Sequence, residues 1–398
     1  MRVLVTGAKG FVGRNLCEAL KAIRDGKDRR ERFRALLPLE VMECDLGTTA
    51  EELDAMCARA DFVFNLAGVN RPEDPAEFMA GNFGFASDLL AALERHGNAC
   101  PVMLASSVQA SLVGRYAGSA YGESKLAGEE LFRSYSDRTG APVLIYRFPN
   151  LYGKWCYPNY NSAVATFCDA IANDREYTVN DPSVELELLY IDDLVAEMLS
   201  ALLGEERHCG YDGLAEIEGD DFCACRPTDR ATLGEIVDLL ESFRASRADL
   251  SVPDLADGSF SKKLWSTFES YYDEGSRAYA LKANRDELGS FTEFLRTPER
   301  GQVSVNVSGP GVTKGNHWHH SKNEKFLVVK GTGVIRFRAL DSTEVIEYHV
   351  SGDKLEVVDI PTGYTHNIEN VGQDDMVTVM WASEPFDPER PDTYFLEV

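Results

Sequence analysis

Short apolar runs alternate with longer helical patterns through the first half of the chain. Four runs have the length of β-strands and end in small or polar residues: RVLVTG (2–7), LEVMECD (39–45), DFVFNLAG (61–68) and PVMLASS (101–107). This alternation predicts a parallel sheet with crossover helices. Because open parallel sheets bind ligands beyond the carboxyl ends of their strands, the ends of the four runs should form one cleft.

After Gly289 the pattern changes to many short, closely spaced strands. They are QVSVNVS (302–308), KFLVVKG (325–331), GVIRFRAL (333–340), TEVIEYHV (343–350), KLEVVDI (354–360) and MVTVMWA (376–382). Such spacing favours an antiparallel barrel or sandwich. Between the two patterns, residues 205–260 are rich in Gly, Asp and Cys around the helical stretch TLGEIVDLLESFRAS. We therefore expect an α/β domain at 1–260, a linker at 261–288 and an all-β domain at 289–398.

Length and charge narrow the classes of function. The chain has 398 residues, 44% of them hydrophobic, which is enough for two to three domains of roughly 150 residues. Its net charge of −25 disfavours nucleic acid and anionic membrane as partners, because like charges repel. The amino terminus lacks a signal-peptide layout, and no stretch approaches the ~18 apolar residues that span a bilayer. We expect a cytoplasmic protein with neither partner.

Nine cysteines are scattered along the chain, and reduced thiols are expected in a cytoplasmic protein of this size. Cys209, Cys223 and Cys225 lie close together in sequence and could be imagined as a metal site. They lack a paired C-x-x-C spacing, so ordinary thiols in a connecting loop are the favoured interpretation.

A glycine-rich turn follows the first strand. The stretch Thr6-Gly7-Ala8-Lys9-Gly10-Phe11-Val12-Gly13 ends a strand and opens a helix. Glycines in this setting allow a tight turn, the approach of a pyrophosphate to backbone N–H groups, and close packing of helix on sheet. A glycine turn without a ligand is the alternative interpretation.

A second motif strengthens the nucleotide interpretation. Tyr121 and Lys125 in YGESK stand four residues apart on one helix face, after a strand that ends in Ser106 and Ser107. A nearby ammonium favours the ionised form of a tyrosine, whose reference pKa is about 10. Ser107 can hydrogen-bond a carbonyl oxygen, Tyr121 can give it a proton, and Lys125 can hold the cofactor ribose.

These motifs resemble the extended short-chain dehydrogenase/reductase family. The pattern T-G-x-x-G-x-x-G, a strand-end Ser and Y-x-x-x-K occur in the family's order, and YRFPNLYG (146–153) and LYIDDLVAEML (189–199) match later segments. The resemblance, which covers roughly residues 1–250, implies Tyr121, Lys125, Ser107 and Asn82 as catalytic residues. It implies these cofactor contacts besides Tyr121 and Lys125: Gly7, Lys9, Gly10, Phe11, Val12, Gly13, Ala67 and Gly68. Without the family context, Asn82 is as easily a polar residue on a helix surface.

The choice of nicotinamide cofactor depends on residues around the second strand. Glu43 and Asp45 near its end would suit the ribose 2′-hydroxyl of NADH, whereas an arginine would suit the phosphate of NADPH. Four arginines stand just before the strand: Arg29, Arg30, Arg32 and Arg34. The family resemblance favours NADPH, with NADH as the alternative, and the basic run predicts that one or more of these arginines hold the NADPH phosphate.

Three of the chain's seven histidines lie within four positions in GNHWHHSKNEKFLVVKG (315–331). On a strand, His317 and His319 point to the same face. Glu324 begins the next strand, and His366 follows in PTGYTHNIEN. Imidazoles and a carboxylate that converge inside a small barrel form a divalent-metal site, compatible with Zn, Mn, Fe, Co or Ni.

The remaining histidines of this half are expected to have other roles. His320 should point to the opposite face from its neighbours and could serve as an acid or base. His349 stands in an alternating strand and is most simply a surface or core-edge residue.

The spacing of these residues resembles the cupin family. Its first motif is matched by Gly311, His317, His319, Glu324 and Gly331, and the latter half of its second motif by Pro361, Gly363, His366 and Asn370. Gly352 stands farther from Pro361 than that motif expects. The resemblance implies a jelly-roll domain with His317, His319, Glu324 and His366 as metal ligands and zinc as the expected ion.

Over nearly its full length, the chain resembles the bifunctional enzymes of capsular-polysaccharide synthesis. The stretches that carry this are GKWCYPNYNSAVATFCDAI, TLGEIVDLL, GNHWHHSKNEKFLVV and PDTYFLEV. The resemblance implies an α/β Rossmann-type domain of the extended short-chain dehydrogenase/reductase kind, followed by an all-β cupin (jelly-roll) domain, in a homodimer. It implies a UDP-activated 4-keto-6-deoxy N-acetyl amino sugar, UDP-2-acetamido-2,6-dideoxy-L-hexos-4-ulose, as substrate on the route to UDP-N-acetyl-L-fucosamine.

The ketone of such a substrate sets the order of two reactions. A carbonyl acidifies the neighbouring C–H, and a metal on its oxygen would stabilise the enolate, so the cupin should epimerise C3. Reduction destroys the ketone, so NADPH-dependent reduction of C4 to the L-talo product should come second. Two rivals remain open: an Fe(II) oxygenase fused to a reductase, and a cupin that only binds sugar or builds a dimer around a structural metal.

Overall fold

The computed structural model describes residues 1–398 except 71, 73, 75 and 298, and it divides into two compact units. The α/β unit comprises Met1–Leu240 and Ala256–Asp273, and the β unit comprises Glu241–Leu255 and Glu274–Val398. Helix α8 (Leu233–Asp249) therefore begins in one unit and ends in the other. The three-part division expected from the sequence stays a prediction.

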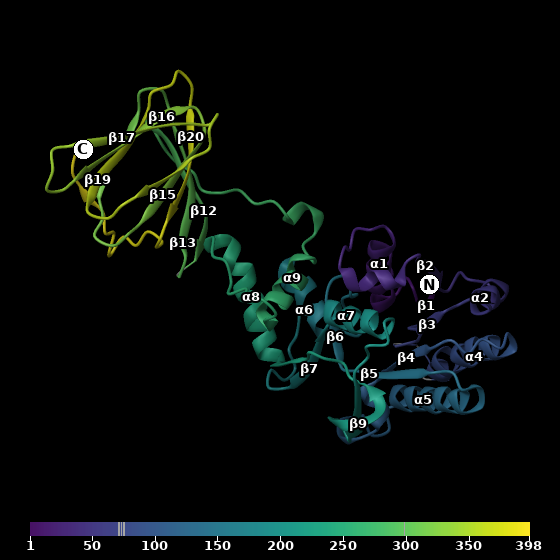
Figure 1. The fold of residues 1–398 in the computed structure, drawn as a ribbon. Coiled ribbons are helices and arrows are strands. Elements are labelled where there is room, and N and C mark those ends of the chain that lie inside the picture. Colours follow the sequence, from purple (N-terminus) through teal and green to yellow (C-terminus); the bar gives the residue numbers. More distant parts are fainter. Residues whose placement is uncertain (71, 73, 75, 298) are drawn as a thin grey trace. The chain divides into compact units, whose positions relative to one another are not determined.

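The α/β unit contains a seven-stranded sheet in the order β2-β1-β3-β4-β5-β9-β8 and a three-stranded sheet in the order β10-β7-β6 (Figure 1). Its strands are β1 (Arg2–Thr6), β2 (Glu40–Cys44), β3 (Phe62–Asn65), β4 (Val102–Ser107), β5 (Val143–Phe148), β6 (Asn150–Tyr152), β7 (Glu185–Tyr190), β8 (His208–Asp212), β9 (Ala215–Cys223) and β10 (Asp229–Thr232). Its α-helices, besides α8, are α1 (Phe11–Arg24), α2 (Ala50–Cys57), α3 (Ala76–Phe78), α4 (Phe85–Arg95), α5 (Ala120–Thr139), α6 (Ala163–Ala172), α7 (Ile191–Ala201) and α9 (Phe260–Glu269). Among the helices of the described chain, none is long and apolar enough to cross a bilayer.

The first five strands of the large sheet run parallel, as the alternation of apolar runs and helices predicts. Thr6 at the end of β1 pairs with Cys44 of β2 and Asn65 of β3, so the carboxyl ends of these strands lie at one edge. The glycine turn, the residues after β3 and the end of β4 consequently meet there, which is where open parallel sheets bind ligands.

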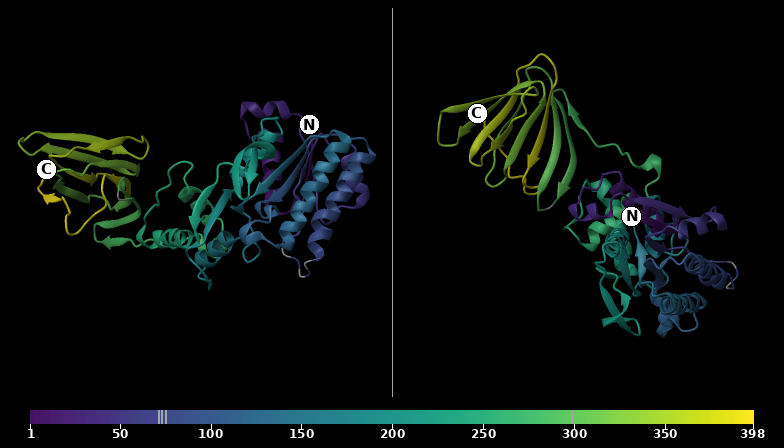
Figure 2. Two further views of the ribbon diagram at one scale, coloured as in Figure 1. Left: turned by 90° about the horizontal axis from the view of Figure 1, so that it is seen from below. Right: turned by 45° about the vertical axis from the view of Figure 1, so that its right-hand side comes forward.

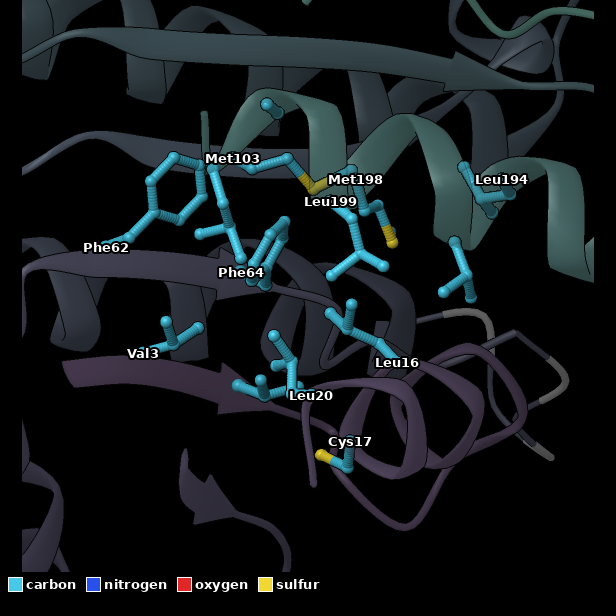
Figure 3. Packing of buried hydrophobic residues seen from close by; sticks show 14 of the residues in the cluster. Val3, Leu16, Cys17, Leu20, Phe62, Phe64, Met103, Leu194, Met198 and Leu199 are labelled. Carbon is cyan, nitrogen blue, oxygen red and sulfur yellow. The ribbon is translucent and has the colours of Figure 1, made fainter. Parts of the chain in front are cut away.

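Apolar side chains cover both faces of this sheet. On one face, Leu16 and Leu20 of α1 and Met198 of α7 pack against Phe64 of β3 (Figure 3). Helices α2, α4 and α5 bury their apolar stripes on the other face, and Figures 1 and 2 show α4 and α5 running along it. Each buried Leu or Phe side chain contributes roughly 1.5–3 kcal/mol, so the strands that carry the site are firmly held.

Two segments differ from the expected loops. The basic and polar residues of the stretch 24–34 predict a loop, but α1 continues to Arg24, and a 3₁₀ helix begins at Glu31 and ends at Leu36. Phe33 and Leu36 of that helix are buried in the core. The stretch expected as a linker from 261 contains most of α9, which buries Leu264 and Phe268. In both segments, apolar residues spaced three or four apart turn a polar-looking stretch into a helix with one buried face.

The β unit consists of two antiparallel sheets, in the orders β11-β12-β13-β20-β15-β18 and β17-β16-β19-β14-β21. Its strands are β11 (Asn284–Asp286), β12 (Gly289–Thr297), β13 (Gly301–Ser308), β14 (Thr313–Trp318), β15 (Glu324–Lys330), β16 (Thr332–Ala339), β17 (Val345–Ser351), β18 (Val357–Ile360), β19 (Tyr364–Asn370), β20 (Met376–Ala382) and β21 (Tyr394–Phe395). All six strands predicted from the apolar pattern are present, whereas that pattern had not indicated β11, β12, β14, β19 or β21. Alternate residues such as Phe326, Val328 and Ile368 fill the core between the sheets.

Candidate active site and metal centre

The glycine turn between β1 and α1 is built for close backbone approach. Gly7 adopts φ +64°, and a Cβ on Gly13 would lie 2.1 Å from the carbonyl oxygen of Gly7. Helix α1 begins at Phe11 with no side-chain cap on its first turn and no acidic residue in it. Its first N–H groups are therefore free of side-chain acceptors, as a diphosphate site at a helix amino terminus requires.

The end of β3 joins this turn to the predicted catalytic residues. Thr6 Oγ1 accepts hydrogen bonds from Ala67 N and Leu66 N, each at 3.1 Å. A Cβ on Gly68 would lie 2.7 Å from Asn82 Oδ1 and 3.3 Å from Lys125 Nζ. The structure thus brings the glycine turn and the predicted residues Ala67, Gly68, Asn82 and Lys125 into one neighbourhood.

Asn82 is buried and fully engaged. It lies in a π-helical turn, Met79–Gly84, at the start of α4. Its Oδ1 accepts from Val69 N at 2.8 Å, and its Nδ2 donates to Val69 O and to Ser124 Oγ. Asn82 therefore ties the loop after β3 to the helix of Tyr121. Its burial excludes the helix-surface interpretation, and its catalytic role stays a prediction.

Ser107, Tyr121 and Lys125 form the predicted group at the ends of β4 and α5. The Ser107 hydroxyl lies near the Tyr121 phenol, and Lys125 Nζ donates to Ala105 O at 3.0 Å. Burial raises the pKa of Tyr121 to about 12, with Ser107 acting in the opposite direction. Burial lowers the pKa of Lys125 to about 8, although Glu129 opposes this. At neutral pH Tyr121 keeps its proton and Lys125 keeps its charge, so the pair has the protonation of an acid catalyst.

Sequence reasoning missed a buried ion pair beside Lys125. Glu129, one helical turn after Lys125, makes two hydrogen bonds with Arg147 of β5, at 2.7 and 2.9 Å. Ser106 Oγ donates to the same carboxylate. The i,i+4 spacing from Lys125 and the arginine in YRFPNLYG were the available signals.

The four arginines expected to bind NADPH lie at the wrong edge of the sheet. They precede Glu40, the first residue of β2, whereas the glycine turn faces the strand's carboxyl end. Three of the four arginines form ion pairs within the chain: Arg30 with Asp28, Arg32 with Glu205, and Arg34 with Glu31. The expectation that they hold a cofactor phosphate is therefore corrected.

Acidic residues stand at the carboxyl end of β2 instead. Asp45 Oδ2 accepts from Lys9 N in the glycine turn at 2.6 Å, and Glu43 pairs with Lys21 at 2.8 Å. A cavity of about 270 Å³ beside Glu43 is also lined by Lys9, Arg14 and Lys21. Asp45, held against the turn, has the position of the acid that contacts a ribose hydroxyl in dinucleotide sites.

Eight of the nine cysteines, all in the α/β unit, are buried thiols, and Cys100 is partly buried. Burial raises the pKa of Cys209 to about 11 and that of Cys223 to about 12, so neither is a thiolate at neutral pH. In the described part of the chain, these residues and Cys225 belong to no group of potential metal ligands.

In the β unit, the structure brings His317, His319, Glu324 and His366 together. One ligand atom from each lies within 4.8 Å of all the others. His319 and His366 are buried, at 3% and 1% exposure. The cluster draws on β14, the turn after it, β15 and β19, and a bulge at Asn316, with φ +56°, sets His317 opposite His366.

The protonation of this cluster suits a divalent cation. Burial, together with the neighbouring imidazoles, lowers the pKa of His317 to about 4. Burial raises the pKa of Glu324, but His319 and His366 outweigh it and hold the pKa well below its usual range. Neutral imidazoles and one carboxylate are the donor set that divalent transition metals take.

His366 supplies an independent test of fit. Its Nε2 lies 3.1 Å from Glu324 Oε2 without hydrogen-bond geometry, and neither ring nitrogen has a hydrogen-bond partner among the described residues. A buried polar atom without a partner costs about 1–3 kcal/mol. A cation between His366 Nε2 and Glu324 Oε2 would give both atoms a partner, so these residues fit a metal.

The other histidines lie outside the cluster. His320 packs its ring against Trp318 and Tyr394, with centroids 4.5 and 5.1 Å away. His349 lies on the exposed strand β17. A cavity of about 540 Å³ opens beside Glu324 and is lined by Tyr348, Tyr364 and Trp381, which the sequence had not indicated.

Both parts of the chain match known protein families. Residues 3–208 match the NAD-dependent epimerase/dehydratase family, and residues 284–394 match the polysaccharide biosynthesis C-terminal domain. The chain belongs to the NAD-dependent epimerase/dehydratase family, which confirms a Rossmann-type domain followed by an all-β domain and a nicotinamide cofactor for the class.

Individual relatives narrow the resemblance. UDP-2-acetamido-2,6-beta-L-arabino-hexul-4-ose reductase of Pseudomonas aeruginosa is 40% identical over 398 residues, which cover 100% of this chain and 99% of the relative. The crystal structure of the capsular polysaccharide assembling protein CapF from Staphylococcus aureus superposes with a TM-score of 0.86 at 51% identity, covering 100% of both chains. A UDP-glucose 4-epimerase of Thermus thermophilus, with a TM-score of 0.51 and 19% identity, covers 68% of this chain and 99% of its own and shares the fold alone. The predicted resemblance to capsular-polysaccharide enzymes is thereby confirmed.

Proposed function

We propose that the chain is a bifunctional nucleotide-sugar enzyme. Its β unit would epimerise C3 of UDP-2-acetamido-2,6-dideoxy-L-hexos-4-ulose, and its α/β unit would then reduce the C4 ketone to the L-talo product. The observation that carries this is the occurrence in one chain of the Ser107–Tyr121–Lys125 group and of four converging metal-type ligands. The name of the Pseudomonas relative, a reductase of a UDP-linked 4-ketose, supports the substrate class.

Reduction needs a hydride at C4 and a proton at its oxygen. A bound nicotinamide supplies the hydride. The Ser107 hydroxyl orients the ketone oxygen, and Tyr121, protonated because burial raises its pKa to about 12, donates the proton as negative charge develops on that oxygen. Lys125 lies 5.6 Å from the centre of the Tyr121 ring, and its charge stabilises the phenolate that remains.

Epimerisation needs removal and return of the C3 proton. A divalent cation at the cluster would supply Lewis-acid stabilisation for charge on a ketone oxygen. His317, His319, Glu324 and His366 would hold it, and the aromatic cavity beside Glu324 gives a sugar ring room. Zinc as the ion and the homodimer stay predictions from the family resemblance.

Deuterium exchange tests the two halves separately. The metal-loaded protein, incubated with the 4-keto sugar in deuterated water without reduced nicotinamide, should incorporate deuterium at C3. Addition of reduced nicotinamide should consume the ketone without oxygen uptake, whereas oxygen uptake would point to the oxygenase. Chelator-treated protein is the control. Absence of C3 exchange by the metal-loaded protein would reject the epimerase half, and an unreduced ketone with both NADH and NADPH would reject the reductase half.

A further inference from the structure

The last residues of the chain lie along the strand that carries two of the histidines. Strand β21 pairs antiparallel with β14, placing Phe395 opposite His317 and Tyr394 opposite Trp318. Leu396 N donates to Asn316 O at 2.9 Å. We name residues 391–397 the C-terminal strap. It closes the edge of the sheet immediately beside the metal-type cluster.

Asp392 fastens the strap to the turn after β14. Its carboxylate accepts hydrogen bonds from the backbone N–H groups of His320, Ser321 and Lys322, at 2.9, 2.9 and 3.0 Å, and from the Ser321 hydroxyl at 3.2 Å. Lys322 Nζ donates back to Pro391 O at 2.8 Å. Successive N–H groups around one carboxylate make charge-assisted bonds, which are the stronger kind.

The same residue contacts a ring nitrogen of the cluster. The carbonyl oxygen of Asp392 lies 2.5 Å from His319 Nδ1. A carbonyl oxygen can only accept, so Nδ1 carries the proton, and in the neutral imidazole that a metal binds Nε2 then keeps its lone pair. That lone pair faces Glu324 Oε2 at 3.3 Å, on the side where the other ligand atoms gather. A metal-binding histidine commonly has its second nitrogen fixed in this way.

Among the residues that the structure describes, His366 lacks the kind of outer contact that the strap gives to His319. Its Nδ1 has no partner within the described chain, so no outer contact fixes its tautomer. Asp392 itself holds φ +37°, a backbone conformation that side-chain-bearing residues rarely adopt and that persists only when surrounding contacts determine it. The carboxylate bonds to the turn are those contacts.

We infer that Asp392 is a positioning residue of the metal centre. Its carboxylate anchors the C-terminal strap to the turn after β14, and its carbonyl thereby holds His319 in the tautomer and orientation that present Nε2 to an ion. The inference rests on the proposed metal site and deepens it. It also gives PDTYFLEV, the terminal stretch of the sequence resemblance, a physical role.

Metal affinity of the full chain tests the inference. Chelator-stripped protein is titrated with Zn²⁺ against a competing fluorescent chelator, and with Co²⁺ while its visible absorption is recorded. Asp392→Ala should weaken Zn²⁺ binding by roughly 10–100-fold and change the Co²⁺ spectrum, because loss of an outer contact reorients a ligand. Asp387→Ala is the matched control, since Asp387 pairs with Arg390 in the same terminal segment and its carboxylate accepts from Glu389 N. It should bind both metals as the parent does.

Nicotinamide binding accompanies each titration and should not change in any variant, and the melting temperature of the metal-free protein measures what the lost strap contacts cost the fold. Asp392→Asn, which keeps an acceptor oxygen, should recover part of the affinity. Unchanged Zn²⁺ affinity and an unchanged Co²⁺ spectrum in Asp392→Ala would overturn the inference while leaving the proposed metal site standing. Equal losses in both variants with a lowered metal-free melting temperature would assign Asp392 a purely structural role. A parent protein that takes up neither metal would overturn the metal site and the inference together.

Discussion

In the α/β unit the buried polar groups of the site find partners within the protein, whereas in the β unit some do not. Lys125 Nζ bonds Ala105 O, and Asn82 bonds both Val69 and Ser124. By contrast, His366 has no hydrogen-bond partner within the described residues, and Glu324 lies between it and His319.

This difference separates a preassembled site from one that an ion completes. The site in the α/β unit holds Tyr121 in its protonated form, ready to donate that proton to the ketone oxygen. The site in the β unit leaves lone pairs converging on one volume, an arrangement that costs stability until a cation neutralises it. The two sites should therefore respond to different perturbations, and each can be removed without the other.

Tyr121→Phe should have the largest effect. The substitution removes the phenolic proton donor but keeps the ring that packs against Phe78, with centroids 5.6 Å apart. Ketone reduction should fall by roughly 10²–10⁴-fold, the usual contribution of a general acid. Deuterium exchange at C3 should continue at the parent rate. Loss of exchange in a folded variant would contradict the division of labour between the units.

Glu324→Ala should do the reverse. It removes the one carboxylate of the cluster, and with it the negative charge that a divalent cation needs beside three neutral imidazoles, so metal content and C3 exchange should both be lost. Nicotinamide binding, and reduction of a sugar supplied already epimerised, should stay within about twofold of the parent, a difference of roughly 0.4 kcal/mol. Elemental analysis and the exchange assay measure the outcome. Normal exchange would mean that the histidines form a structural site.

The preassembled nature of the nucleotide site can be tested with two glycines. At Gly13 a Cβ would lie 2.1 Å from the Gly7 carbonyl oxygen, whereas at Gly128 in α5 it would meet nothing within 4 Å. Gly13→Ala should lower the free energy of unfolding by about 1–3 kcal/mol and weaken nicotinamide binding. Gly128→Ala should raise it by roughly 0.5–1 kcal/mol, because alanine favours a helix. Denaturant titration of both variants checks this, and equal effects would refute the close-approach argument.

The sites of the α/β unit and the β unit were also predicted from different kinds of sequence pattern. The glycine turn and Tyr121–Lys125 lie within contiguous motifs, so their local spacing predicts their geometry. The ligands in the β unit are distant in sequence, but strand periodicity and the cupin spacing were enough to predict their convergence.

The contacts that could not be predicted join segments whose partner lies far along the chain. Asp392 reaches the turn after β14 from 70 residues away, and Arg147 reaches Glu129 across strand and helix. The arginines before β2 misled because closeness in sequence to a strand does not say at which end of it a side chain lies. Register supplies that information.

Asp45 carries the next prediction, on cofactor choice. Its carboxylate is held against the glycine turn at the carboxyl end of β2, where it would accept a hydrogen bond from a ribose 2′-hydroxyl and repel a 2′-phosphate. NADH should therefore bind more tightly than NADPH. Asp45→Asn should weaken NADH binding by roughly 10–100-fold, since hydrogen bonds to charged groups are worth about 1.5–3 kcal/mol.

Dissociation constants from nicotinamide fluorescence measure this preference. Glu43→Gln is the control, because Glu43 is ion-paired with Lys21 and should not contribute to the choice. Tighter binding of NADPH by the parent would show instead that Lys9, Arg14 or Lys21, which line the neighbouring cavity, hold the phosphate.

The smallest expected effect is a loss of reductase activity at alkaline pH, which involves the α/β unit alone. Burial lowers the pKa of Lys125 to about 8, so its ammonium is present below that pH and is lost as the pH rises through it. Tyr121, with a pKa raised to about 12 by burial, keeps its proton over the same range. The kcat/KM for reduction should therefore fall by about tenfold between pH 8 and pH 9.5, because the charge that stabilises the phenolate disappears. Lys125→Arg keeps a cation throughout, and its residual activity should not show this alkaline loss. A parent profile that is flat to pH 9.5, or an alkaline loss that persists in Lys125→Arg, would place the titrating group elsewhere and would remove Lys125 from the preassembled site.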